Sequence, residues 1–140
     1  MRYWDSSALV PLLIYELASE RLQRIYRADP GVSAWTLTPV EIASALARKS
    51  RGGLDASSIA EAHDRLGKLR KNWSDVADVP RVRDRAMRLV DTHPLTAADA
   101  LQLAAALVAT EERPQAMGFV TLDAVLAEAA RREGFAVEGM

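Results

Sequence analysis

The sequence predicts an α/β protein with a mainly parallel sheet of four to five short strands and helices on its faces. Two observations carry this prediction: short strand-like segments alternate with longer segments of helical periodicity, and one helical segment is apolar on nearly all sides. The chain has 140 residues, of which 49% are hydrophobic, so it can bury one sizeable core. Because no long linker or repeat divides it, we expect a single domain over residues 1–140.

The strand-like and helical segments follow one another in a regular order. The strands are expected at residues 2–4, 32–35, about 117–121 and 136–137. The helices are expected at residues 9–13, 19–27, 40–49, 55–71, 80–91, 97–112 and 123–133. The segment 97–112 is apolar almost all round, so we expect a central, buried helix there. In such sheets ligands bind beyond the C-terminal ends of the strands, which tells where to look for a site.

Composition limits the chemistry that the chain can perform. There is no cysteine and there are only two histidines, so a bound metal ion must be held by oxygen atoms. No apolar run approaches the roughly 20 residues that span a bilayer, and we expect a soluble, cytoplasmic protein. The net charge of -1 counts mildly against a polyanionic substrate, although the basic residues are clustered and form local patches. One cluster, Arg48, Lys49 and Arg51, is a candidate for contacts with backbone phosphates.

Four acidic residues stand where helices are expected to begin, and each has a sufficient local explanation. Asp5 follows the first strand and is a good N-cap, and Asp123 opens the last helix, where it complements the helix dipole. Glu41 completes a capping box with Thr38, with a proline at the first helical position. Asp99 stands three residues after Thr96, which is the same spacing. From the residues alone, each acid is more simply a structural residue than a catalyst.

Their common location changes this interpretation. Helix starts at one edge of a parallel sheet bring their side chains together, so Asp5, Glu41, Asp99 and Asp123 are expected to converge. Ionised carboxylates at close range repel one another unless a cation neutralises them. Oxygen ligands alone suit Mg²⁺ or Mn²⁺ better than Zn²⁺. The pattern therefore favours a site for a hard divalent cation.

With the residues around these four acids, the sequence resembles the PIN-domain family, and within it the VapC-like toxin ribonucleases of toxin–antitoxin pairs. The resemblance covers nearly the whole chain. It consists of DSSAL from Asp5, TPVEIASAL around Glu41, LTAADALQLA around Asp99, and FVTLD ending at Asp123. The order and spacing of these four motifs together are fairly specific, whereas any one of them alone is weak. Two positions depart from the family pattern, since Gln102 replaces a common histidine and Thr96 a common arginine; neither is a metal ligand there.

The resemblance implies a PIN-like three-layer α/β/α fold and a metal-dependent endoribonuclease. Asp5, Glu41, Asp99 and Asp123 would hold one or two Mg²⁺ or Mn²⁺ ions, and metal-activated water would hydrolyse RNA phosphodiester bonds. The supporting side chains are carried over as Ser6, Ser7 and Thr121. The resemblance also implies a small cognate antitoxin protein as partner and homodimerisation through helices. The apolar segment 9–15 would contribute to a dimer interface unless it packs in the core.

Three alternative functions were weighed against this one. An aspartyl phosphatase needs a second acid two residues after the first, where this chain has Ser7. A nucleotide-binding module needs a glycine-rich phosphate loop after a strand, and none is present. The serious alternative is a non-catalytic PIN-like binding or regulatory module whose acids serve only as helix caps. Binding of Mg²⁺ or Mn²⁺ separates this alternative from the nuclease.

Overall fold

The computed structural model describes all 140 residues and contains one five-stranded sheet in which every pairing is parallel. The strands are β1 (Arg2–Trp4), β2 (Val32–Trp35), β3 (Ser74–Val76), β4 (Gly118–Val120) and β5 (Val137–Glu138). Their order in the sheet is β3-β2-β1-β4-β5, which puts β1 at the centre. The predicted α/β class with a parallel sheet of short strands is confirmed.

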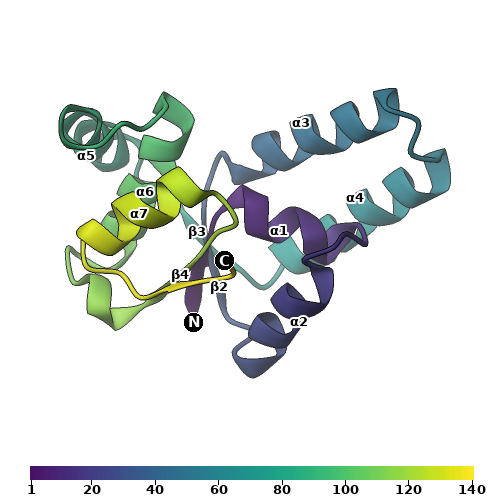
Figure 1. Ribbon diagram of the computed structural model, residues 1–140, viewed down its shortest axis with the longest axis horizontal. Helices are drawn as coiled ribbons and strands as arrows, with labels where there is room; N and C mark the ends of the chain where they lie inside the picture. Colours follow the sequence, from purple (N-terminus) through teal and green to yellow (C-terminus); the bar gives the residue numbers. More distant parts are fainter.

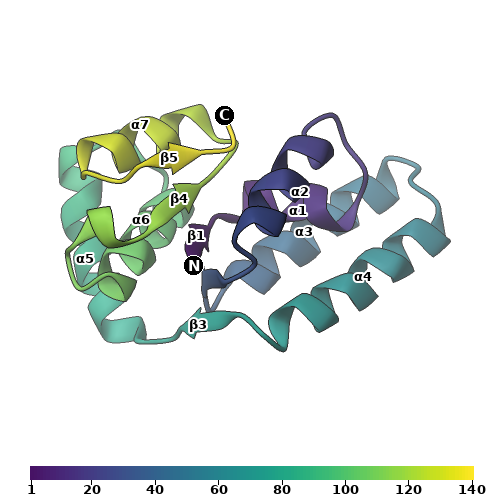
Figure 2. The same cartoon turned by 90° about the horizontal axis from the view of Figure 1, so that it is seen from below.

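Helices cover both faces of the sheet (Figures 1 and 2). One face carries α1 (Ser6–Leu13), α2 (Ser19–Ala28), α3 (Thr38–Arg51) and α4 (Ala56–Arg70), and the other carries α5 (Val79–Thr92), α6 (Ala97–Ala109) and α7 (Ala124–Arg132). A short 3-10 turn, η1 (Pro114–Ala116), precedes β4. Helices α3 and α4 extend away from the sheet as an antiparallel pair. None of the helices combines the length and apolarity needed to cross a bilayer.

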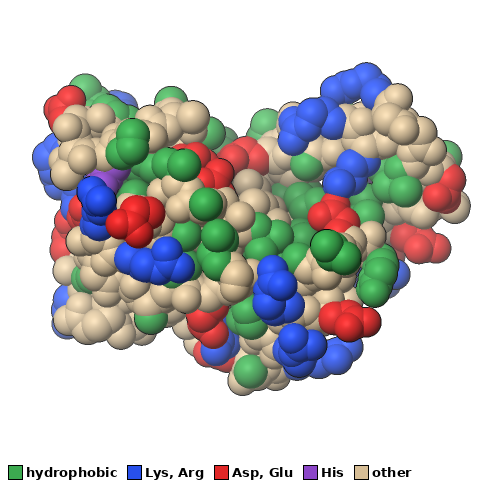
Figure 3. Space-filling view, viewed as in Figure 1, with side chains coloured by type: hydrophobic (Ala, Val, Ile, Leu, Met, Phe, Trp, Pro, Cys, Tyr) green, Lys and Arg blue, Asp and Glu red, His purple; other side chains and the backbone are tan.

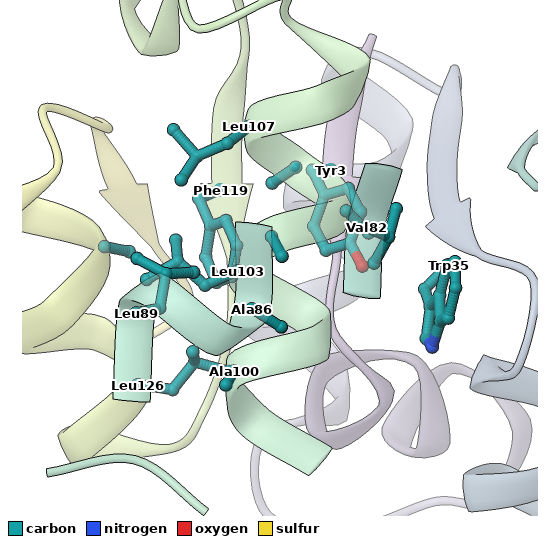
Figure 4. Close-up of a cluster of buried hydrophobic side chains, with 14 of the residues drawn as sticks. Tyr3, Trp35, Val82, Ala86, Leu89, Ala100, Leu103, Leu107, Phe119 and Leu126 are labelled. Carbon is teal, nitrogen blue, oxygen red and sulfur yellow. The ribbon is translucent and has the colours of Figure 1, made fainter. Parts of the chain in front are cut away.

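Two hydrophobic cores lie on opposite faces of the sheet, because successive side chains of a strand point in opposite directions. On the central strand, Tyr3 packs in the core under α5, α6 and α7, while Trp4 packs in the core under α1 to α4. Figure 4 shows the first of these cores, in which Tyr3 stacks on Phe119 with ring centroids 5.2 Å apart. The expected central helix is confirmed as α6, whose Leu103 is fully buried.

One detail of the sequence-based fold is wrong. The edge strand β3 was not predicted, because Ser74 and Asp75 are exposed and only Val76 is buried, so the segment has no apolar pattern to detect. For the apolar segment 9–15 the sequence left core packing and a dimer interface open, and the structure buries its Leu9 and Leu13 in the second core. Both features depend on which neighbouring elements cover a segment.

The buried position of α6 gives a prediction for stability. Replacement Leu103→Ala removes a fully buried side chain and leaves a cavity, so we expect the free energy of unfolding to fall by about 2–5 kcal/mol. The matched control is Leu17→Ala, since Leu17 is fully exposed, and its effect should stay within about 0.5 kcal/mol. Urea unfolding followed by circular dichroism measures both values. Equal effects of the two substitutions would contradict the described core.

Candidate metal and active site

The four acids predicted from the sequence lie at the C-terminal edge of the sheet or at the helix starts beside it. Asp5 follows β1 and caps α1, Glu41 and Asp99 lie in the first turns of α3 and α6, and Asp123 caps α7. In the space-filling view, acidic side chains gather in the notch between the surface formed by α7 and that formed by α3 (Figure 3). The topology therefore brings all four to one region of the molecule.

Asp5 is the most enclosed of the four, with 3% of its surface exposed. Three hydroxyl groups surround its carboxylate. Oδ2 accepts hydrogen bonds from Ser7 Oγ at 2.5 Å and from Thr121 Oγ1 at 2.9 Å. Ser6 Oγ lies 3.4 Å from Oδ1 of Asp5 and 3.3 Å from Oε2 of Glu41, so it stands between the two acids. The three supporting residues taken from the family pattern thus all contact an acid of the site.

Glu41 does not have the local role that the sequence suggested. The expected capping box is wrong, because α3 begins one residue earlier, Thr38 lies inside its first turn, and no side chain caps this helix. The carboxylate of Glu41 instead accepts a hydrogen bond of 2.6 Å from Gln102 Nε2 on α6. Glu41 is therefore held by long-range contacts at the sheet edge, which helix capping does not explain.

Gln102 is a buried polar side chain in an apolar helix, and all its polar atoms have partners. It is 0% exposed. Its Nε2 donates to Glu41 and, at 3.0 Å, to Thr38 Oγ1, while its Oε1 accepts from Tyr3 Oη at 2.5 Å. A buried amide is tolerable only when it is bonded in this way. Gln102 thus fixes the carboxylate of Glu41 relative to the central strand.

Sequence reasoning noted Gln102 only as a departure from a family pattern and missed Tyr3. A signal was present, since a glutamine three residues after Asp99 falls on a neighbouring position of a helix that is otherwise apolar. A polar side chain in such a helix needs a partner. Its partners were not predictable, because they lie 61 and 99 residues away in sequence.

Asp99 and Asp123 differ in what holds them. Asp123 is the N-cap of α7, and its Oδ1 accepts from Leu126 N at 2.9 Å, so the predicted capping role is confirmed. Asp99 is not a cap: Thr96 is the N-cap of α6, and its Oγ1 accepts from Asp99 N at 3.2 Å. The predicted N-cap role of Thr96 is therefore confirmed. The side chain of Asp99 takes no part in this cap and lies in the first turn of α6.

Burial is the chief cause that raises the pKa of Asp5, Glu41 and Asp99, and neighbouring acids add to the rise at Glu41 and Asp99. Burial raises the pKa of Asp5, although hydrogen bonds from Ser7 and Thr121 oppose the rise. Burial, the chief cause, and the charges of Asp5 and Asp99 raise the pKa of Glu41. Burial, together with the charges of Asp123 and Asp5, raises the pKa of Asp99 to about 6. None of the ion pairs in the structure involves any of the four acids, so no basic side chain neutralises them by direct contact.

Whether the residues fit a divalent cation follows from their chemistry. No three Asp, Glu or His side chains lie in positions to hold one ion as the structure stands. The available donors are nevertheless carboxylate and hydroxyl oxygens, which hard cations prefer. Burial makes their ionised forms costly, and no basic side chain forms an ion pair with them to offset that cost. The donor set therefore fits Mg²⁺ or Mn²⁺ in chemistry and charge.

Another cavity of the molecule contains none of the four acids and no other carboxylate ligand. It has a volume of about 500 Å³ and lies between α1, α2 and α4, next to the residues that precede β2 and β3. Its lining contains Arg27, Arg65 and Lys68 but no acidic side chain. A hard divalent cation has no anionic ligand there. Volume alone therefore does not locate the candidate metal site.

Comparisons with known proteins support the fold. No protein-family model and no curated protein sequence matches the chain. Among solved structures, PAE2754 from Pyrobaculum aerophilum is similar with a TM-score of 0.67 and 22% identity, over 98% of this chain and 83% of that one. FitAcB from Neisseria gonorrhoeae is similar with a TM-score of 0.67 and 17% identity, over 98% and 96%. At these identities the likeness shows the fold alone, and the predicted PIN-like fold class is confirmed.

The contacts of Gln102 give a second prediction. Replacement Gln102→Leu leaves Tyr3 Oη and Glu41 without their partner in the interior, so the free energy of unfolding should fall by about 1–3 kcal/mol. The control is Gln115→Leu, because Gln115 is exposed in η1 and should change stability by about 0.5 kcal/mol or less. Chemical unfolding measures both. Unchanged stability in Gln102→Leu would show that the buried hydrogen-bond chain is not formed in solution.

The raised pKa of Asp99 gives a third prediction, for the metal-free protein. Because its folded-state pKa of about 6 exceeds the ordinary 3.8, the folded state holds the proton more tightly than the unfolded state, and stability falls as pH rises from about 4 through about 6. Asp99→Asn removes this loss, so the variant should be more stable than the parent at pH 8 in EDTA and gain little at pH 4.

The control for this effect is Asp64→Asn on α4, where Asp64 pairs with Lys68 at the surface. It should show no gain in stability at pH 8, since an exposed pair contributes little and its loss does not stabilise. Thermal unfolding at several pH values measures the difference. A pH-independent effect of Asp99→Asn would contradict the electrostatic coupling of the acids.

Proposed function

We propose that this protein is a Mg²⁺- or Mn²⁺-dependent endoribonuclease and the toxin of a toxin–antitoxin pair. The observation that carries the proposal is the uncompensated cluster of carboxyl groups at the C-terminal edge of the sheet. A protein that kept these acids only as helix caps would gain nothing from burying one of them and placing the others within electrostatic range. A cation that binds there turns this repulsion into attraction.

Within this function the four acids bind the cation and the hydroxyl groups orient the acids. Ser7 and Thr121 hold Asp5 through its Oδ2, and Gln102 holds Glu41 through its Oε1. Such fixed ligands lower the cost of ordering a metal site. When bound, the cation supplies an activated water and stabilises charge on the phosphoryl oxygens. No cysteine is available as a nucleophile, and the arrangement favours direct hydrolysis of the phosphodiester.

The contacts of Glu41 favour the nuclease over the non-catalytic binding module. The binding module requires all four acids to have structural roles as caps. Asp5 and Asp123 do cap helices, but Glu41 does not, and its partners come from α1 and α6. A glutamine buried in the core to hold a half-buried carboxylate is costly for a purely structural purpose. This arrangement supports the nuclease.

The partners follow from the resemblance in sequence. We propose a small antitoxin protein that blocks the acidic notch, and a cytoplasmic homodimer. The segment 9–15 is mostly buried and is not available for such a dimer. Helix α5 exposes apolar side chains at Val79, Met87 and Val90, which fall on one side of the helix and support a contact with a second copy.

The metal site is tested directly by neutralising its ligands. We expect Asp5→Asn and Asp99→Asn to abolish Mn²⁺ binding in calorimetry and to abolish cleavage of a single-stranded oligoribonucleotide, because each variant removes an anionic oxygen from the donor set. Growth arrest on overproduction should disappear with both. The matched control Asp64→Asn, which changes an exposed carboxylate on α4, should bind and cleave as the parent does.

Two results would reject the proposal. One is the absence of Mg²⁺ and Mn²⁺ binding by the parent chain. The other is RNA cleavage and toxicity that survive both Asp5→Asn and Asp99→Asn. Either result would leave the non-catalytic binding module as the better account of the fold.

A further inference from the structure

A groove leaves the acidic notch between α1 and α3. Its first part has a volume of about 390 Å³ and begins at Ser6, Ser7 and Glu41, which belong to the acidic site. A second part, of about 400 Å³, adjoins it, because both are lined by Ser7, Val10, Ala45 and Arg48. In the space-filling view, cationic side chains lie over α3 beyond the acidic notch (Figure 3). The groove thus leads from the carboxylates to a basic end.

The spacing of residues on α3 explains this arrangement. Glu41, Ser44, Ala45 and Arg48 stand at positions i, i+3, i+4 and i+7, so they share one face of the helix. A rise of 1.5 Å per residue separates Glu41 from Arg48 by roughly 10 Å along the axis. Between them on α3 the lining consists of Ser44 and Ala45, and Val10 of α1 lines the same groove. Acid, apolar wall and cation therefore follow one another along a single groove.

The three basic residues of α3 differ in what neutralises them. Lys49 forms an ion pair with Glu16 at the same end of the groove. Arg51 does not line either part of the groove. Arg48 has no acidic partner, and its Nη1 donates a hydrogen bond of 2.9 Å to Ser44 Oγ, which orients the guanidinium. Arg48 is therefore the one cation of the groove whose charge is free to bind an anion.

We propose that Arg48 binds a backbone phosphate of single-stranded RNA next to the scissile bond, with the intervening sugar and base against the wall formed by Val10 and Ala45. This inference rests on the proposed nuclease function. The guanidinium presents paired N–H donors that match two phosphate oxygens. A single strand has exposed bases and sugars that contact apolar side chains, as the wall of the groove requires.

The salt dependence of binding tests the phosphate contact without requiring cleavage. In the Asp99→Asn background, binding of a fluorescent single-stranded oligoribonucleotide is measured by anisotropy at several salt concentrations. The logarithm of affinity falls as the logarithm of salt concentration rises, and Arg48→Ala should make this fall less steep by about 0.7, the value of one single-strand phosphate contact. Arg51→Ala, on the same helix but outside the groove, should leave the slope and the affinity unchanged.

A second measurement identifies the phosphate. Oligoribonucleotides carrying one neutral methylphosphonate at successive positions are bound to both proteins. The Asp99→Asn protein should lose affinity roughly ten- to hundredfold at one position beside the scissile bond, and the protein that also carries Arg48→Ala should show no further loss there. In the otherwise unmodified chain, Arg48→Ala should raise KM and leave kcat unchanged, because a flanking contact is equal in ground state and transition state.

The outcomes separate this inference from the proposed function. If the parent chain cleaves RNA but Arg48→Ala behaves as Arg51→Ala does, the phosphate contact is wrong and the nuclease stands. If Arg48→Ala leaves RNA binding intact and weakens binding of a Glu-rich peptide instead, the groove accepts an acidic protein segment and the inference is overturned. If the parent neither binds nor cleaves RNA, both the inference and the proposed function fail.

Discussion

The parallel pairing of β1 with β4 is the constraint on which the site depends. It sets Trp4 opposite Val120, so the next residues, Asp5 and Thr121, leave the sheet side by side, and Thr121 Oγ1 donates to Asp5. The same edge is closed by the C-terminal segment. Thr121 N donates to Glu138 O, and Gly139, at φ 102°, passes so near that a Cβ would lie 2.8 Å from Thr121 O. A shift of this register would separate the first acid from its support.

The ionised acids at this edge destabilise the folded state. Burial raises the pKa values of Asp5, Glu41 and Asp99, and neighbouring acids add to the rise at Glu41 and Asp99, so ionising these groups costs the folded state free energy. Hydroxyl groups of Ser6, Ser7 and Thr121 offset part of that cost without adding charge. The hydroxyl groups leave the negative charge of the ionised acids in place beside the N-terminus of α6. A cation that binds only the folded state would add its binding free energy to stability, so metal affinity and folding are linked here.

The sequence predicts the parts of this molecule that depend on local pattern. β1 and β2 lie where they were expected, and Asp5, Asp123 and Thr96 cap helices as the motifs indicated. Predictions fail where distant contacts override local preference. Thr38 has the sequence of an N-cap, yet it is fully buried and its hydroxyl accepts from Gln102 instead. The exposed strand β3 pairs because β2 lies beside it, and no pattern within its three residues indicates this.

Under the proposed function, an amide suits the position beside Glu41, because a cation site has to keep its negative charge. A basic side chain at position 102 would also donate to Glu41, but it would cancel one negative charge of the cluster and weaken the attraction for a cation. A carboxylate there would add repulsion. Gln102 donates to Glu41 and accepts from Tyr3 while remaining neutral, so it fixes the geometry and leaves the field intact. Under the same proposal, the position of Arg48 two helical turns from Glu41 on α3 would let it bind a phosphate without neutralising the acids.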